Sequence, residues 1–401
     1  MSVWLHIEDF MAYQQVSRDF WKQRIMDAWK RRSIIWLSGV RRAGKTILCQ
    51  SLANVEYYDC ELPRVRQGLE DPESFLELNR GKSIVLDEVH RLHNPSELLK
   101  IAADHFPETK IIATGSSTLE ASSKFKDTLT GRRERIWLTP MLVEEGKDFG
   151  NSNLDHRFLF GGLPPFFLSL QIPERDFQDW VDSYWAKDIQ ELYRLEKKYS
   201  FQKFLELILA QSGAVFEATR FTTPCEVSRT TIANYLSVLE ATHIAHVIRP
   251  FNTHRPNEIV SAPKVYGFDT GFVCYYKGWL NLRNEDFGIL WEHIVLNELQ
   301  GHLQTKEIRY WRDKQDHELD FIILPSRNSH PLAIECKWKA ASFDPASLKS
   351  FRQHYPEGPN FIVSSDVERS YTRQYGEIKV TFVSLAQLMN ALTKNDASSL
   401  S

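Results

Sequence analysis

Four short segments in the first 115 residues have the pattern of strands, and the segments between them look helical. The strand-like segments are 34–37, 55–59, 83–87 and 110–114. The segment 83–87 is a continuous apolar run without alternation, which is typical of a strand buried on both faces. Strands that alternate with helices predict a parallel sheet covered by helices on each side. We therefore expect a doubly covered α/β domain over residues 1–150.

The pattern changes after about residue 150. Residues 174–218 look mainly helical, and Ser228 is placed to cap a helix that carries apolar residues at 232, 235, 236 and 239. Residues 243–251 then have the pattern of a strand and a turn, and the chain beyond 266 returns to mixed α/β character. We predict three domains: 1–150, 151–265 and 266–401.

The composition is that of a soluble globular chain, and it restricts the cellular compartment and the kinds of partner that we expect. The five cysteines are scattered without a C-x-x-C pair, which argues against a disulfide framework or a structural zinc site and favours the reducing cytoplasm. No run of about 18 apolar residues occurs, so we expect no membrane span. The net charge of -3 shows no chain-wide basic footprint for nucleic acid, although a local patch stays open.

The loop after the first strand matches the phosphate-binding pattern G-x-x-x-x-G-K-[ST]. The glycines allow backbone N–H groups to surround phosphate oxygens, the lysine can reach the terminal phosphates, and the threonine hydroxyl can bind magnesium. An apolar strand precedes the loop and a helix follows it, as the motif requires. We predict an ATP site with Mg²⁺ formed by Gly39, Val40, Arg41, Arg42, Ala43, Gly44, Lys45, Thr46 and Ile47.

The strand at 84–86 ends in Asp87 and Glu88. Alone, this pattern would indicate two solvated acids. Downstream of a phosphate-binding loop it predicts a magnesium-binding Asp87 and a Glu88 that polarises the attacking water as general base. The next buried strand ends in hydroxyl residues, of which Thr114 or Ser116 could contact the γ-phosphate or the water. Its alternative is a loop rich in turn-forming residues.

Together these motifs resemble the AAA-type ATPases that carry a C-terminal DUF4143 region. The resemblance rests on GVRRAGKT, IVLDE, IIATGSS, LTGR and LTP in this order, and on the GG-x-P loop at 161–164. It implies an AAA+-like core in which an arginine of the same subunit, of another copy or of a protein partner completes the ATP site. Arg132 is the first candidate and Arg133 the second, although Thr130 departs from the family's small residue and a surface arginine is the alternative.

The middle region also resembles the winged helix of that family. A winged helix can place its second helix in the major groove of DNA, so DNA is a candidate partner. The exposed face of the helix after Ser228 has only Arg229 as a cation. Phosphate contacts normally dominate affinity for DNA, so a packing module of the same shape is the alternative.

Four polar residues near the C-terminus follow the order of a PD-(D/E)xK nuclease core. Glu292 lies on a predicted amphipathic helix, Asp320 begins a strand, and Glu335 and Lys337 share one face of the next strand. Asp320 and Glu335 could bind a second Mg²⁺ or a Mn²⁺, and Lys337 could stabilise developing charge. The last domain of the family also resembles this fold, and a nuclease-like fold used only for binding is the alternative.

Three functions follow from these patterns. The first is an ATPase that uses hydrolysis to switch or remodel a target. The second is a metal-dependent nuclease that ATP gates. The third is a nucleotide-switched interaction protein with a catalytically silent nuclease-like domain.

Overall fold

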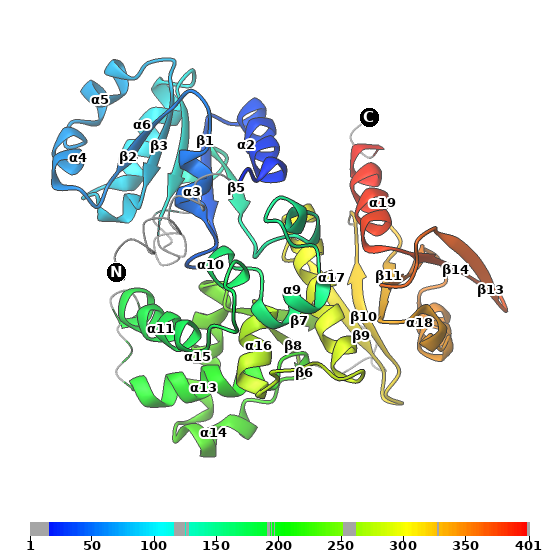
Figure 1. Ribbon diagram of the computed structural model, residues 1–401. Helices are drawn as coiled ribbons and strands as arrows, with labels where there is room; N and C mark the ends of the chain where they lie inside the picture. The colour runs from blue at the N-terminus through cyan, green and yellow to red at the C-terminus, as the bar shows by residue number, and fades with distance from the viewer. Residues whose placement is uncertain are drawn as a thin grey trace. The chain divides into compact units, whose positions relative to one another are not determined.

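The computed structural model describes residues 16–115, 125, 128–190, 193, 195, 197–251, 262–326 and 329–398 (Figure 1). Its contacts divide the chain into two compact units. The first comprises Met1–Asn153, Gly162–Glu196 and Ala241–His243, and the second comprises Leu154–Gly161, Lys197–Glu240 and Ile244–Ser401. The chain therefore passes between the two units several times rather than once.

A parallel sheet of order β2-β3-β4-β1-β5 forms the centre of the first unit. Its strands are β1 (Ile34–Ser38), β2 (Val55–Asp59), β3 (Ser83–Asp87), β4 (Lys110–Thr114) and β5 (Arg133–Trp137). The apolar residues of β1, β3 and β4 are fully buried, as strands covered on both faces require. The predicted α/β class is confirmed.

Helices flank this sheet. They are α2 (Asp19–Arg31), α3 (Lys45–Gln50), α4 (Pro63–Gly68), α5 (Pro72–Leu78) and α6 (Pro95–His105), with the short 3₁₀ turns η1 (Val89–Arg91) and η2 (Val143–Lys147). The helices α4, α5 and α6 each begin at a proline, whose fixed φ suits the first helical turn. The same unit contains α10 (Pro164–Phe167), α11 (Glu174–Tyr184) and a π-helical turn, η3 (Trp185–Gln190).

The second unit is built on a mixed sheet of order β13-β14-β12-β11-β10-β9-β7-β8-β6. Its strands are β6 (Ala214–Val215), β7 (Ala245–Pro250), β8 (Lys264–Gly267), β9 (Ile308–Arg312), β10 (Glu318–Ile323), β11 (Leu332–Lys337), β12 (Asn360–Ser364), β13 (Tyr371–Tyr375) and β14 (Ile378–Val383). The boundary we expect at residue 265 falls inside β8, so this one sheet contains strands from both sides of it.

The helices of the second unit are α9 (Leu154–Phe160), α13 (Lys198–Ala210), α14 (Thr219–Cys225), α15 (Arg229–Ala241), α16 (Thr270–Lys277), α17 (Asp286–Leu303), α18 (Ala346–His354) and α19 (Leu385–Ser398), with the 3₁₀ turn η5 (Ala340–Ser342). Ser228 accepts a hydrogen bond from the Thr231 N–H at 3.2 Å, so it caps α15 as predicted. The helix α17 is buried around most of its circumference, not only on the apolar side that its sequence suggested.

The helix pair α14–α15 and the antiparallel strands β7 and β8 follow the order expected of a winged helix. The strand β7 also pairs in parallel with β9. The hairpin is therefore part of the nine-stranded sheet instead of a free wing. The winged-helix assignment stays a prediction.

Candidate functional site

The phosphate-binding loop joins β1 to α3 at the carboxyl edge of the parallel sheet. Gly39 has φ 148° and Gly44 has φ 92°, a backbone conformation that favours glycine. A Cβ atom on Gly39 would lie 2.4 Å from the carbonyl oxygen of Leu138. The motif glycines are thus required both by the turn and by the close approach of the chain after β5.

Lys45, the first residue of α3, folds back over this loop. Its ammonium donates hydrogen bonds to the carbonyl oxygens of Gly39 at 2.8 Å and Val40 at 3.1 Å. Burial lowers the pKa of Lys45, and the charges of Glu88, Asp188 and Asp87 oppose this effect. The cation is thus held inside the curve of the loop, where the motif places the terminal phosphates.

Asp87 is brought next to Thr46, although the two are 41 residues apart. The Thr46 hydroxyl donates to Oδ2 of Asp87 at 2.8 Å, and the Tyr57 hydroxyl donates to the same oxygen at 2.5 Å. Thr114 donates to the other carboxylate oxygen. The structure therefore gathers hydroxyl and carboxylate oxygens, the hard ligands that Mg²⁺ prefers, beside the phosphate-binding loop.

Glu88 occupies a left-handed backbone conformation, with φ 56° and ψ 45°. Its N–H donates to the hydroxyl of Thr114 at 3.0 Å, and its Oε2 lies 3.0 Å from Nδ1 of His90. Burial favours the protonated acid, but His90 and Lys45 outweigh burial and lower the pKa of Glu88. Glu88 is therefore a carboxylate at neutral pH, the form that a general base needs.

The predicted sensor residues have different outcomes. Thr114 is fully buried and holds both Asp87, the last residue of β3, and Glu88, which follows it, through hydrogen bonds. Ser116 lies outside the described residues, so its role stays a prediction.

Arg132 and Arg133 lie where β5 begins. Arg132 pairs with Asp104 at the end of α6, with 2.6 Å between Nε and Oδ1. The Arg133 guanidinium lies over the rings of Trp36 and Phe125. Because β5 runs parallel to β1, the start of β5 lies at the amino edge of the sheet. The phosphate-binding loop leaves β1 at the carboxyl edge, about 16 Å away along the strands. Arg132 and the phosphate-binding loop of its own subunit are thus not brought together.

Three residues that no motif indicated also contact the loop. Arg18 donates to the carbonyl oxygen of Ala43 at 2.7 Å, and Asp188 lies 2.9 Å from Nε of Arg41. The Trp180 indole N–H donates to the carbonyl oxygen of Arg41 at 3.2 Å. Each of them is more than 20 residues away in the sequence, so only the fold reveals the contact.

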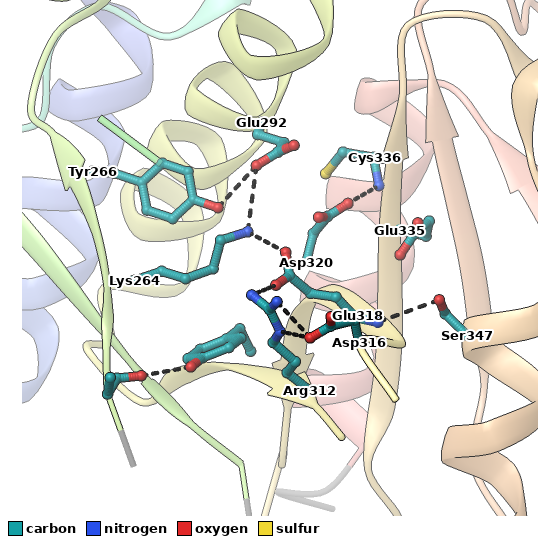
Figure 2. Close-up of polar contacts among 12 residues, drawn as sticks. Lys264, Tyr266, Glu292, Arg312, Asp316, Glu318, Asp320, Glu335, Cys336 and Ser347 are labelled. Carbon is teal, nitrogen blue, oxygen red and sulfur yellow. Dashed lines mark hydrogen bonds and ion pairs between the residues drawn. The ribbon is translucent and has the colours of Figure 1, made fainter. Parts of the chain in front are cut away.

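The C-terminal acids also converge, as Figure 2 shows. The antiparallel register of β10 and β11 pairs Phe321 with Ile334, which sets Asp320 opposite Glu335. Lys337 lies 2.7 Å from Oε1 of Glu335, so the predicted shared face is confirmed. Oδ2 of Asp320 accepts the Cys336 N–H at 2.8 Å.

A lysine that the sequence pattern did not indicate lies in this cluster. The Lys264 ammonium is 2.7 Å from Oε1 of Glu318 and 3.9 Å from Oε2 of Glu292 (Figure 2). Glu292 also accepts a hydrogen bond from the Tyr266 hydroxyl at 2.9 Å. Lys264 on β8 thus supplies a fixed, buried positive charge to the acids.

The acids of the cluster resist ionisation. Burial and the charge of Asp320 raise the pKa of Glu292 and of Glu335 to about 8 each. Oε2 of Glu335 is buried and makes no hydrogen bond within the described part of the chain.

Across the described ranges, no three His, Cys, Asp or Glu side chains are arranged to hold a metal ion. No described helix is long and apolar enough to cross a membrane.

Models of known protein families match three parts of the chain. Residues 31–146 match the model of an AAA domain, and residues 287–388 match that of a domain of unknown function, DUF4143. Residues 151–285, between them, match a further domain of unknown function, DUF8612.

Similar proteins are found in bacteria. An uncharacterized protein of Mycobacterium tuberculosis is 26% identical over 339 residues, which cover 82% of this chain and 75% of that protein. An uncharacterized protein of Haemophilus influenzae is 21% identical over 351 residues, covering 77% and 86%. Among solved structures, a Walker-type ATPase of Pyrococcus abyssi is 14% identical and covers 65% of this chain and 96% of that one, with a TM-score of 0.42.

The family matches agree with the geometry. The AAA match contains the whole parallel sheet, the phosphate-binding loop, Asp87 and Glu88. The DUF4143 match contains Glu292, Asp320, Glu335 and Lys337. The chain therefore contains an AAA-type P-loop ATPase domain, over residues 31–146, and a C-terminal DUF4143 region, over residues 287–388.

Proposed function

We propose that the protein binds ATP with Mg²⁺ on residues 39–47, hydrolyses it, and uses the cycle to switch the conformation of the remaining chain. The observation that carries this proposal is the hydrogen bond from Thr46 to Asp87, which joins the phosphate-binding loop to the acid of β3 at 2.8 Å. These two residues would hold the magnesium ion. When bound, the ion would supply positive charge that offsets the negative charge developing on the phosphate.

The chain's own residues supply the remaining steps. Backbone N–H groups of the loop and the Lys45 ammonium bind the phosphates, and Glu88 accepts a proton from the attacking water. Thr114 holds Asp87 and Glu88 in register, through its hydroxyl. Ser116 is proposed to contact the γ-phosphate or the water.

Arg132 is proposed to act on the ATP site of another copy. Its position at the amino edge of the sheet supports a role between subunits rather than within its own. A homo-oligomer, or a protein partner that supplies the arginine, would complete each site. The described cysteines are unpaired and buried, in keeping with the reducing cytoplasm that we propose as the location.

The Glu88→Gln variant tests hydrolysis apart from binding. We expect its rate of phosphate release to fall by about 100-fold, because loss of a general base typically costs 10²–10⁴. Its affinity for Mg-ATP should stay close to that of the wild type. The measurement is steady-state phosphate release with nucleotide affinity by calorimetry, and Glu70→Gln, an exposed acid of the same unit, is the control. Equal rates in Glu88→Gln and wild type would refute the assigned base.

A second candidate function is metal-dependent cleavage of DNA by the C-terminal cluster. The buried, unpartnered Oε2 of Glu335 favours it, because a carboxylate oxygen in that position can be satisfied by a bound cation. Asp320 and Glu335 would be the ligands, with Glu292 and Lys337 beside them. The Lys264 charge, which already offsets the acids, supports the alternative of a silent domain that only binds.

Cleavage of supercoiled and linear DNA in Mg²⁺ or Mn²⁺ distinguishes these two possibilities. If the cluster is a nuclease, the double variant Asp320→Asn, Glu335→Gln loses cleavage and keeps ATP hydrolysis. Cleavage that persists in the double variant would refute these ligands. No cleavage by the wild type on any substrate would favour the silent domain.

A further inference from the structure

The segment from α10 to η3 contacts the phosphate-binding loop at consecutive residues. We propose that Asp188 in η3 gates the ATP site: its carboxylate holds Arg41 and competes with the phosphates of the nucleotide, so that ATP binding releases η3 from the loop. The inference rests on the proposed function, since it requires that ATP binds this loop.

The contacts come from three parts of the segment. Asp188 pairs with Arg41 at 2.9 Å, and the two side chains keep only 23% and 30% of their exposure. The buried indole of Trp180 on α11 donates to the Arg41 carbonyl oxygen. The Arg42 guanidinium lies 5.9 Å from the ring centre of Phe166 on α10. One continuous stretch of chain thus contacts the backbone and both arginines of the loop.

The charge of Asp188 reaches the centre of the site. It is one of three carboxylates, with Glu88 and Asp87, whose negative charges act on the Lys45 ammonium. Glu88 and Asp87 are the expected base and magnesium ligand, but Asp188 has no such role. A nucleotide brings several negative charges to the same cations, and like charges in a partly buried site disfavour one another.

The local structure of η3 suits a switch. It is a π-helical turn. Such turns are rare in proteins, and those that occur are often found at functional sites. Within the same unit, Tyr184 at the end of α11 shares a hydrogen bond of 2.7 Å with Thr242. Residues 190 and 242 lie close in sequence to Lys197 and Ile244, where the chain enters the second unit. The end of η3 is thus near one place where the chain crosses between units, and Tyr184, the residue before η3, is bonded to a residue near a second.

A purely structural ion pair would have the opposite consequence. If Asp188 only orders Arg41 and the loop, then its removal should weaken nucleotide binding. If Asp188 competes with phosphate, then its removal should strengthen binding. The sign of the change in affinity therefore separates the two roles.

The experiment uses the full chain and Mg²⁺ with a slowly hydrolysed ATP analogue. Calorimetry should give the Asp188→Asn variant an affinity about fivefold or more above wild type, the lower range of typical coupling between sites. Asp188→Glu keeps the charge and should resemble wild type. Asp179→Asn, which removes an exposed acid of α11, is the matched control. Thermal melts of each variant confirm that it is folded.

Hydrogen exchange provides the second readout. In wild type the nucleotide should speed exchange across residues 185–190, and in Asp188→Asn exchange there should be fast with or without nucleotide. Unchanged or weaker binding by Asp188→Asn, or exchange at 185–190 that ignores nucleotide, would overturn the gate. If wild type binds no nucleotide at all, the proposed function fails; if wild type binds and Lys45→Ala does not, a null result for Asp188→Asn concerns the gate alone.

Discussion

The Lys45→Ala protein should release phosphate from ATP on the order of 10³-fold more slowly than wild type, because it loses a preorganised cation at the transferring phosphate. The physical basis is the position of the Lys45 ammonium, held by the carbonyl oxygens of Gly39 and Val40 inside the loop. Since burial already disfavours the charged form of Lys45, its interaction with phosphate is made in a site with little competing water.

A phosphate-release assay with purified protein and Mg-ATP measures this effect. Lys82→Ala is the control, because Lys82 is an exposed lysine of the same unit that pairs with Glu56. We expect the control to keep the wild-type rate. Equal, trace rates in Lys45→Ala and wild type would mean that the released phosphate does not come from this site.

The Arg18→Ala substitution should destabilise the first unit by about 3–5 kcal/mol, the usual cost of removing one partner from a buried ion pair. Arg18 donates to both oxygens of Glu145, at 2.6 and 2.9 Å, and the two side chains are 5% and 2% exposed. Glu145 would stay buried, with the Trp21 indole and the Leu142 N–H as its remaining donors. These two neutral donors do not replace the lost charge.

Urea unfolding measures this loss of stability. The transition that belongs to the first unit is the one whose midpoint nucleotide shifts. Arg32→Ala removes an exposed arginine just after α2 and should change that transition by less than about 0.5 kcal/mol. Because Arg18 also donates to the carbonyl oxygen of Ala43, the variant should in addition bind nucleotide more weakly. A shift in Arg18→Ala no larger than in Arg32→Ala would contradict the importance assigned to this pair.

The sequence pattern predicts β1, β2, β3 and β4 well, because buried strands leave short, nearly continuous apolar runs. It misses β5, whose residues Arg133, Glu134 and Arg135 are charged. This strand lies at the edge of the sheet, and its membership is decided by pairing with β1, a contact between residues about 100 positions apart. The sequence pattern likewise places β7 and the C-terminal strands in separate domains, whereas the structure joins them in one sheet.

The ATP site was predictable where its chemistry is contiguous. The loop and the Asp87–Glu88 pair are short motifs, and Thr114 follows from a strand that ends at the same edge. Tyr57, Arg18 and Asp188 belong to no motif, since single polar residues in amphipathic segments resemble surface positions. Lys264 escapes notice for the same reason. The distance of Arg132 from its own loop follows from strand direction, because a residue before a parallel strand lies at the amino edge.

The most direct test of the ATP site is a crystal structure of the Glu88→Gln protein grown with Mg²⁺ and ATP. We expect density for the phosphates within hydrogen-bond distance of the backbone N–H groups of residues 42–46 and of Lys45 Nζ. We expect a magnesium ion beside Thr46 and Asp87, and a water facing residue 88. Nucleotide bound elsewhere, or an empty loop at ATP concentrations that saturate binding in solution, would contradict the account.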